Sequence, residues 1–223
     1  MPVIKTVQIY KVGAPSIVVQ AIGSLMTYGM NLILAAFGSA QTVFGIYFKL
    51  QSFVFMPVFG LNNGMVPIIA YNYGAGHKDR VIKTIKHSVA YGVGIMFVGL
   101  LAMHIFPAQL MRMFDAEESL IAIGAPALET ISLSFVFAGF CIVAGSVFQA
   151  LGNGVYSMIV SVARQMCVLL PVAKLLSLSG EVTLIWWAFP IAELASVLLT
   201  SYFLVRIYRK VICHIGEPVV QDA

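Results

Sequence analysis

The stretch His87–Phe106, HSVAYGVGIMFVGLLAMHIF, contains no Lys, Arg, Asp or Glu. A helix needs about 20 mainly apolar residues to cross a bilayer, and this stretch meets that requirement. Five more stretches of the chain resemble it. The six predicted spans are Ala14–Phe37, Val43–Tyr71, His87–Phe106, Ala125–Leu151, Ser157–Leu178 and Leu184–Tyr208.

The composition of the 223-residue chain favours lipid as its solvent. Hydrophobic residues make up 60% and charged residues only 10% of the chain, whereas a soluble domain carries roughly 25% charged residues. Much of any compact domain faces water, so a soluble fold of this size cannot hide so much apolar surface. We therefore expect an all-α integral membrane protein. Residues 1–13 form a cytoplasmic N-terminal segment, residues 14–208 the six-helix transmembrane unit and residues 209–223 a cytoplasmic tail in this prediction.

The sequence carries no signature of a soluble enzyme. It lacks the phosphate-binding, zinc-protease and serine-hydrolase motifs, so we expect a protein that is not an enzyme and has no cofactor. Cys141, Cys167 and Cys213 form no C-x-x-C pair, which argues against a zinc site or a disulfide framework; no metal site is expected. The net charge of +4 comes from basic residues beside apolar spans, which indicates membrane topology rather than a nucleic-acid partner. Nothing resembles a cleaved signal peptide.

The distribution of Lys and Arg predicts the orientation. If both termini are cytoplasmic, the inside segments hold nine of the thirteen basic residues, namely Lys5, Lys11, Lys78, Arg80, Lys83, Lys86, Arg206, Arg209 and Lys210. The outside loops then hold Arg112 and four acidic residues, Asp115, Glu117, Glu118 and Glu181. The positive-inside rule therefore favours cytoplasmic termini and an even number of crossings.

The second span is too long for one straight crossing. Gly60, Gly64 and Pro67 lie in its second half, and we expect a bend or a break there, with these residues and Pro190 of the sixth span as hinges. Gly60 and Gly64 also have the spacing that permits close contact between helices.

Glu193 is the clearest ionisable residue at membrane depth. It lies nine residues into the sixth span, about 13 Å along the helix axis, and Pro190 lies one turn earlier. A carboxylate there costs several kcal/mol unless it is paired or hydrated. Two interpretations stay open: a carboxylate that couples transport to H⁺ or Na⁺, and a structural carboxylate bonded to a neighbouring helix.

Other polar side chains inside the spans are weaker candidates. Lys49 is either an anchor at the membrane surface or a cavity-lining charge, and Arg164 is more consistent with a helix contact or lipid anchor. The amides of Gln20, Asn31 and Gln149 either bond between helices or line a wet cavity.

Several motifs resemble the carboxyl-terminal lobe of the multidrug and toxic compound extrusion (MATE) family. The most specific is the run Tyr71, Asn72, Tyr73, Gly74, Ala75 and Gly76, preceded by Gly60–Ala70 and followed by Lys78–Val81. Weaker matches are Gly13–Pro15 through Asn31 to Phe37–Gly38, Val147–Gly152 with Ser157 and Arg164–Gln165, and Trp187–Pro190 with Glu193.

This resemblance implies secondary active transport, in which H⁺ or Na⁺ is exchanged for drugs or organic cations across the bacterial inner membrane. Family members rock two six-helix lobes around a central cavity, and this chain matches the second lobe only. The carboxylates that some branches place in the first and fourth helices of this lobe are absent here. The resemblance implies that Glu193, Gln20, Asn31 and Gln149 help to line the cavity and that the Tyr71–Gly76 turn lies at its cytoplasmic end.

Several alternatives stay open at this point. The chain is expected to be half of a transporter from a truncated or split gene, with the missing amino-terminal lobe as its partner. It could instead work as a homodimer of half-size transporters. A lipid-linked sugar flippase and a non-transporting membrane scaffold subunit are the remaining possibilities.

Overall fold

The computed structural model describes the backbone of residues 2–216 and the side chains of residues 13–216. The described backbone is helical and contains no strand. The α-helices are α1 (Pro2–Leu34), α2 (Ala40–Gly74), α3 (Lys78–Ile105), α4 (Pro107–Arg112), α5 (Glu118–Ser132), α6 (Phe135–Ala150), α7 (Gly154–Val162), α8 (Leu170–Ser177), α9 (Val182–Ile185) and α10 (Ala188–Lys210). Short 3₁₀ helices η1 (Ala35–Phe37) and η3 (Ile212–His214) and a π-helical segment η2 (Ala163–Leu169) complete the chain. Part of the predicted tail, residues 217–223, lies outside the described residues.

The helices confirm the predicted all-α membrane fold. Five helical stretches are long and apolar enough to cross a bilayer, and the bent pair α5–α6 makes a sixth. The first helix already begins at Pro2, so it continues through most of the segment that the hydropathy pattern places before the first span. The fifth span consists of α7, η2 and α8 joined end to end.

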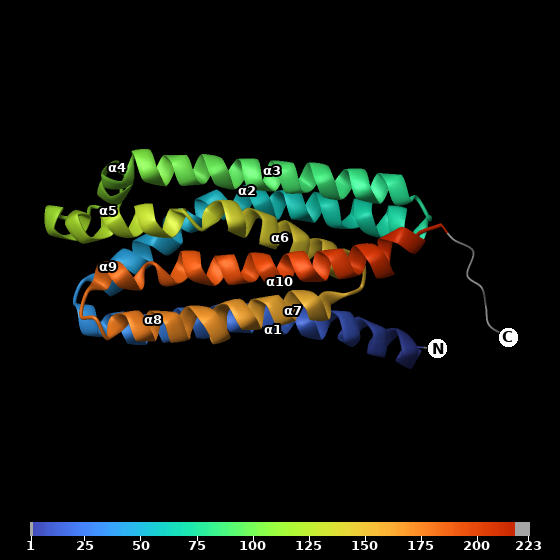
Figure 1. Cartoon of the computed structure of the whole chain (residues 1–223), viewed down its shortest axis with the longest axis horizontal. Coiled ribbons are helices and arrows are strands. Elements are labelled where there is room, and N and C mark those ends of the chain that lie inside the picture. The colour runs from blue at the N-terminus through green and yellow to red at the C-terminus, as the bar shows by residue number, and fades with distance from the viewer. Residues whose placement is uncertain (1, 217–223) are drawn as a thin grey trace.

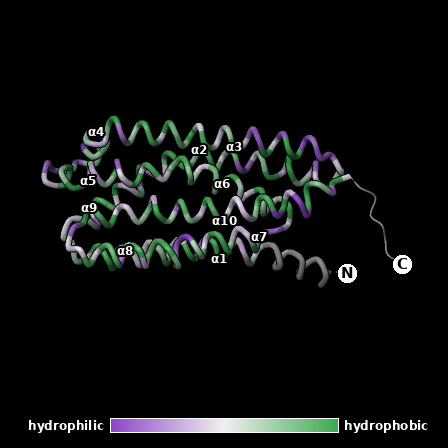
Figure 2. Tube along the Cα trace, in the orientation of Figure 1, coloured by the Kyte–Doolittle hydropathy of each residue, from purple (hydrophilic) through white to green (hydrophobic). Residues whose placement is uncertain are grey.

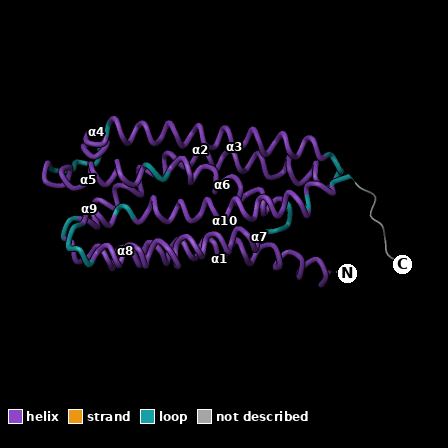
Figure 3. The backbone as a smooth tube through the Cα atoms, in the orientation of Figure 1, coloured by secondary structure: helices purple, strands orange, loops and turns teal. Residues whose placement is uncertain are grey.

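The helices lie side by side, with most loops at the two ends of the bundle (Figures 1 and 3). Both ends of the described chain lie at the same end of the bundle as the turn between α2 and α3 (Figure 1). Hydrophilic residues gather at that end of α3, and apolar residues dominate the middle of the helices (Figure 2). An even number of crossings follows from this arrangement.

The second span, for which we expected a bend or a break, contains no break. Residues Ala40–Gly74 form one continuous α-helix that includes both Pro57 and Pro67. A hinge at Gly60, Gly64 and Pro67 within this unbroken helix stays a prediction.

The interruption occurs instead in the fourth span, which the sequence predicts as a single helix. The chain bends by 49° between the end of α5 and the start of α6. The hydroxyl of Ser132 donates to the carbonyl of Glu129 and that of Ser134 to the carbonyl of Ile131, at 2.9 and 2.7 Å. Such local bonds compete with the helical backbone pattern, which accounts for a bend where the sequence has neither Pro nor Gly.

Glycines allow the closest packing inside the bundle, between α3 and α6. A Cβ atom at Gly92 would lie 2.6 Å from Val143, and one at Gly139 would lie 3.0 Å from the carbonyl oxygen of Gly92. The backbones of the two helices therefore approach as only small residues allow.

An aromatic cluster joins α2 to the start of the last span. Phe44 and Tyr47 of α2 pack against Phe189, with ring centroids 6.1 and 5.8 Å apart, and Phe44 also lies 6.4 Å from the ring of Trp186. This cluster holds the first turns of α10 against α2, one turn before Glu193.

Candidate functional site

The main candidate site is an ion pair between Glu193 of α10 and Arg164 of η2. Arg164 Nη1 donates to Glu193 Oε2 at 3.1 Å. The Glu193 side chain is 6% exposed and that of Arg164 33%, so the carboxylate is buried while the arginine side chain is only partly buried. The bond joins two neighbouring helices, as the structural interpretation of Glu193 requires. Its role in ion coupling stays a prediction.

A π-helical segment presents Arg164 to Glu193. The segment Ala163–Leu169 departs from α-helical geometry just before Pro171. Proline has no backbone N–H, so Pro171 cannot donate to the carbonyl of Cys167 and the regular pattern is lost there. π-helical turns are rare and occur often at functional sites. The widened turn thus marks the part of the fifth span that carries the charge.

Buried hydroxyl groups continue from Glu193 along one face of α10. Ser196 and Thr200 follow at the helical spacings of three and seven residues and are 0% and 1% exposed. Within residues 13–216, Glu193 Oε1, Ser196 Oγ and Thr200 Oγ1 have no hydrogen-bond partner. A buried polar group without a partner costs about 1–3 kcal/mol, so this strip is the least satisfied part of the described interior.

Two further side chains face this strip from other helices. The thiol of Cys141 on α6 lies beside the hydroxyls of Ser196 and Thr200, and Tyr47 of α2 lies within electrostatic range of Glu193 and Arg164. Sequence reasoning named Glu193 and Arg164 without pairing them, and it missed Ser196 and Thr200. Their spacing from Glu193 is the signal that could have found them.

The other predicted cavity residues make their contacts elsewhere. Gln20 is exposed on α1, and the amide of Asn31 donates to the carbonyl of Thr27 in its own helix at 2.9 Å. Gln149 Nε2 donates to Ser157 Oγ at 3.3 Å and so links α6 to α7. The ammonium group of Lys49 lies 5.6 Å from the ring centroid of Phe114. None of these contacts involves Glu193, and the cavity-lining role of these residues stays a prediction.

The Tyr71–Gly76 motif forms the turn between α2 and α3. Helix α2 ends at Gly74, and Gly76 has a φ of 74°, which favours glycine. Asn72 is buried and donates to the carbonyl of Ile68 at 2.8 Å, whereas Tyr71 and Tyr73 are exposed. The turn is thus ordered by Asn72 and presents two tyrosines outward.

The turn between α2 and α3 also contacts the last residues that the structure describes. Lys78 Nζ donates to the carbonyl of Cys213 at 2.8 Å, and the backbone of Gly76 lies against Gly216.

Pro190, the remaining predicted hinge, is buried in the third position of α10. Within the described residues, no group of three His, Cys, Asp or Glu side chains is arranged to hold a metal ion.

The fold and this site define a helical membrane protein with a paired charge inside its bundle. The MatE family model matches residues 15–175. The chain belongs to the MatE family, which confirms the resemblance to MATE transporters.

Curated relatives and solved structures agree with this assignment. The chain is 26% identical to the multidrug export protein MepA of Staphylococcus haemolyticus over 91% of its own length and 45% of that protein. It is 27% identical to MepA of Staphylococcus aureus over 83% of its length and 41% of that protein. A solved structure of the MATE multidrug transporter DinF-BH is 33% identical, with a TM-score of 0.81, over 93% of this chain and 47% of that one.

Another structure shows likeness of fold alone. The Vibrio cholerae MATE transporter VcmN, in its bent form, has a TM-score of 0.85 at 17% identity. In all of these comparisons the chain spans about half the length of the proteins that it matches.

Proposed function

We propose that the chain is one six-helix half of a MATE-type exporter. It moves amphipathic or cationic small molecules out of a bacterial cell in exchange for H⁺ or Na⁺. The observation that carries this proposal is the alignment of 91% of the chain with only 45% of a multidrug export protein. The six apolar helical stretches support it, and we assign the chain to the carboxyl-terminal lobe on the motifs around Tyr71–Gly76.

The proposed working unit contains a second six-helix bundle. That bundle is an amino-terminal lobe or a second copy of this chain. Because six crossings return the chain to the side from which it started, two copies inserted in the same orientation are related by a two-fold axis along the membrane normal. The excess of Lys and Arg near both described ends supports an inner-membrane protein with cytoplasmic termini.

We assign ion coupling to the Glu193–Arg164 pair. Protonation of Glu193, or a Na⁺ ion beside it, weakens its attraction to Arg164 and frees the guanidinium. The Arg164 side chain is already partly exposed, so its charge can move into a hydrated cavity at lower cost than a fully buried one. The pair is then made in one state of the transport cycle and broken in the other.

The test is transport in proteoliposomes that contain the 223-residue chain, alone and joined to an amino-terminal MATE lobe. A pH or Na⁺ gradient should drive movement of a fluorescent organic cation in at least one of the two forms. Glu193→Gln should remove the dependence on the gradient. Arg112→Gln, which breaks the exposed Arg112–Glu118 pair, is the matched control and should keep it.

A non-transporting scaffold subunit is the second candidate, because the bond from Arg164 holds Glu193 between two helices. It predicts that the folded wild-type protein shows no gradient-driven transport in either form. Gradient-driven transport that is unchanged by Glu193→Gln would leave the exporter but remove the coupling role.

A further inference from the structure

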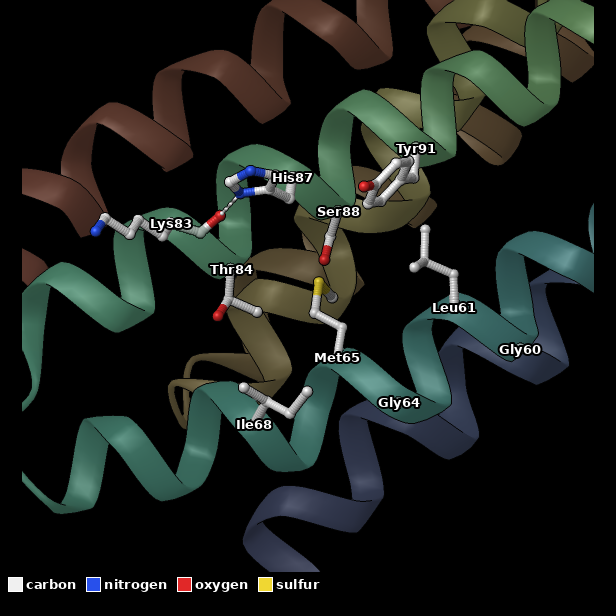
Figure 4. A pocket seen from close by; sticks show the side chains of 10 residues that line it. All are labelled: Gly60, Leu61, Gly64, Met65, Ile68, Lys83, Thr84, His87, Ser88 and Tyr91. Carbon is white, nitrogen blue, oxygen red and sulfur yellow. Dashed lines mark hydrogen bonds between the residues drawn. The ribbon is translucent and has the colours of Figure 1, made fainter.

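A groove lies on the outside of the bundle between α2 and α3, far from the Glu193–Arg164 pair in sequence. Its volume is about 480 Å³, within the range typical of small-molecule sites. Figure 4 shows Leu61, Met65 and Ile68 of α2 on one side and Thr84, Ser88 and Tyr91 of α3 on the other. We call it the α2–α3 groove.

Two glycines keep this groove open. A Cβ atom at Gly60 or Gly64 would meet nothing within 4 Å. These glycines are therefore not there to let α2 pack closely on another described helix. The exposed side chain of Ile68 and the half-buried Leu61 add to an apolar wall.

The groove is polar at one end and apolar at the other. Lys83 borders the end near the start of α3, whereas Tyr91 lies about 12 Å further toward the middle of the same helix, at 1.5 Å per residue. His87 lies between them, with its ring centroid 6.5 Å from that of Tyr91. The nine residues Lys78–Lys86 include four basic side chains and one acidic side chain. Figure 2 shows this end of α3 as hydrophilic.

Lys83 is the best-placed cation on the groove. His87 Nδ1 lies 2.7 Å from the carbonyl oxygen of Lys83 (Figure 4); since a carbonyl only accepts, Nδ1 carries the hydrogen. The other ring nitrogen then donates to an anion only in the protonated ring. The Lys78 ammonium is bonded to the carbonyl of Cys213. A long lysine side chain can place its charge at the level of lipid headgroups.

We propose that the α2–α3 groove binds an anionic phospholipid. Its phosphate contacts Lys83, and one acyl chain lies over Gly60 and Gly64 against Leu61 and Met65. The charge complementarity carries this choice of occupant, because basic pockets between membrane helices bind anionic headgroups. The α2–α3 groove is basic at one end and apolar at the other, as a single lipid molecule with a charged headgroup and an acyl chain requires. A packed helix would instead present apolar side chains along its whole contact. This inference does not depend on the transport function.

The test measures lipid retained by the purified 223-residue protein, using native mass spectrometry after exchange into detergent with cardiolipin or phosphatidylcholine. The wild type should retain cardiolipin and little phosphatidylcholine. Lys83→Gln should retain about fivefold less cardiolipin, the effect of one basic residue near a membrane surface. Lys86→Gln removes the same charge from an exposed residue that does not line the groove, and should lower retention clearly less than Lys83→Gln does.

A second variant probes the apolar end without touching charge. Gly64→Leu fills open space, so the protein should fold and yet lose most of the bound lipid. Equal losses in Lys83→Gln and Lys86→Gln would overturn the proposal in favour of diffuse electrostatic attraction. Unchanged retention in folded Gly64→Leu would overturn it as well. If crosslinking shows that Gly64→Leu breaks a dimer, the groove binds a second copy and the lipid proposal fails.

Discussion

The interface between α3 and α6 and the groove between α2 and α3 both contain a pair of glycines, but the glycines do opposite things. A side chain at Gly92 or Gly139 would run into Val143, Met96 or backbone, while one at Gly60 or Gly64 would enter open space. The interior therefore uses glycine to bring backbones together, and the outer face uses it to leave room. The charged side chains of the two regions also differ, because Glu193 in the interior is buried and paired, whereas Lys83 on the outer face is exposed. The following experiments separate the interior from the outer face.

The largest effect is expected at the buried ion pair. Glu193→Leu should destabilise the protein by about 3 kcal/mol, the low end of the range for a buried pair, because it leaves the partly exposed Arg164 without its partner. The double variant Glu193→Leu with Arg164→Leu should recover most of the loss, since it removes both charges. Unfolding of each variant in a titration with a denaturing detergent gives the loss of stability in the single and the double variant. A double variant as unstable as the sum of the single variants would show that the two residues act independently.

The exposed pair between Arg112 and Glu118 provides the control. Its nitrogen and oxygen lie 2.9 Å apart, closer than the buried pair, but both side chains are more than half exposed. Arg112→Gln should cost at most about 1 kcal/mol. A larger cost would mean that burial does not govern the difference.

The next effect is expected at the tight helix interface. Gly139→Ala should destabilise the protein by about 1–3 kcal/mol through overpacking, because its Cβ would lie 2.9 Å from Met96 and 3.0 Å from the carbonyl oxygen of Gly92. Thermal unfolding in detergent micelles gives the measurement. If Gly139→Ala is as stable as the wild type, the two helices can separate slightly and the interface is not close-packed.

A smaller effect, with the opposite sign, is expected along the buried face of α10. Thr200→Val keeps the shape of the side chain and removes a hydroxyl that has no partner within residues 13–216. We expect a stability equal to that of the wild type or up to about 1 kcal/mol higher. A clear loss of stability would show that the hydroxyl is hydrogen-bonded in the membrane. The same unfolding assay decides between these results.

The smallest effect is expected in the groove. Gly60→Ala should stabilise α2 by about 0.5–1 kcal/mol, since alanine restricts the unfolded chain more than glycine does and its Cβ meets nothing. A destabilisation as large as that of Gly139→Ala would show that another helix covers this face and would remove the contrast between the two regions.

The helix count and much of the fold could be predicted because hydropathy is local. A membrane span can be recognised from about 20 consecutive residues, without information on the rest of the chain. Of the bend or break expected in α2, the break is absent, because proline is tolerated inside a membrane helix, where neighbouring groups can satisfy the freed carbonyl. The bend between α5 and α6 was missed because its cause lies in serine hydroxyls that turn back on their own backbone.

The candidate site was only partly predictable. Depth in the membrane identified Glu193, because a carboxylate there is costly under any arrangement. Its partner, 29 residues away in the chain, depends on how α10 and η2 are rotated and packed. The amide of Gln149 bonds to Ser157 of the next helix, and its role in lining a cavity stays a prediction.

By itself, the sequence determined that this protein is a bundle of membrane helices of the MATE type, because apolar length and a local turn motif are properties of consecutive residues. Only the tertiary structure decided that Arg164 is the partner of Glu193. It alone also showed that Gly92 and Gly139 meet close neighbours while Gly60 and Gly64 leave a groove. These outcomes depend on which helix faces which, and packing between segments distant in the chain sets that arrangement.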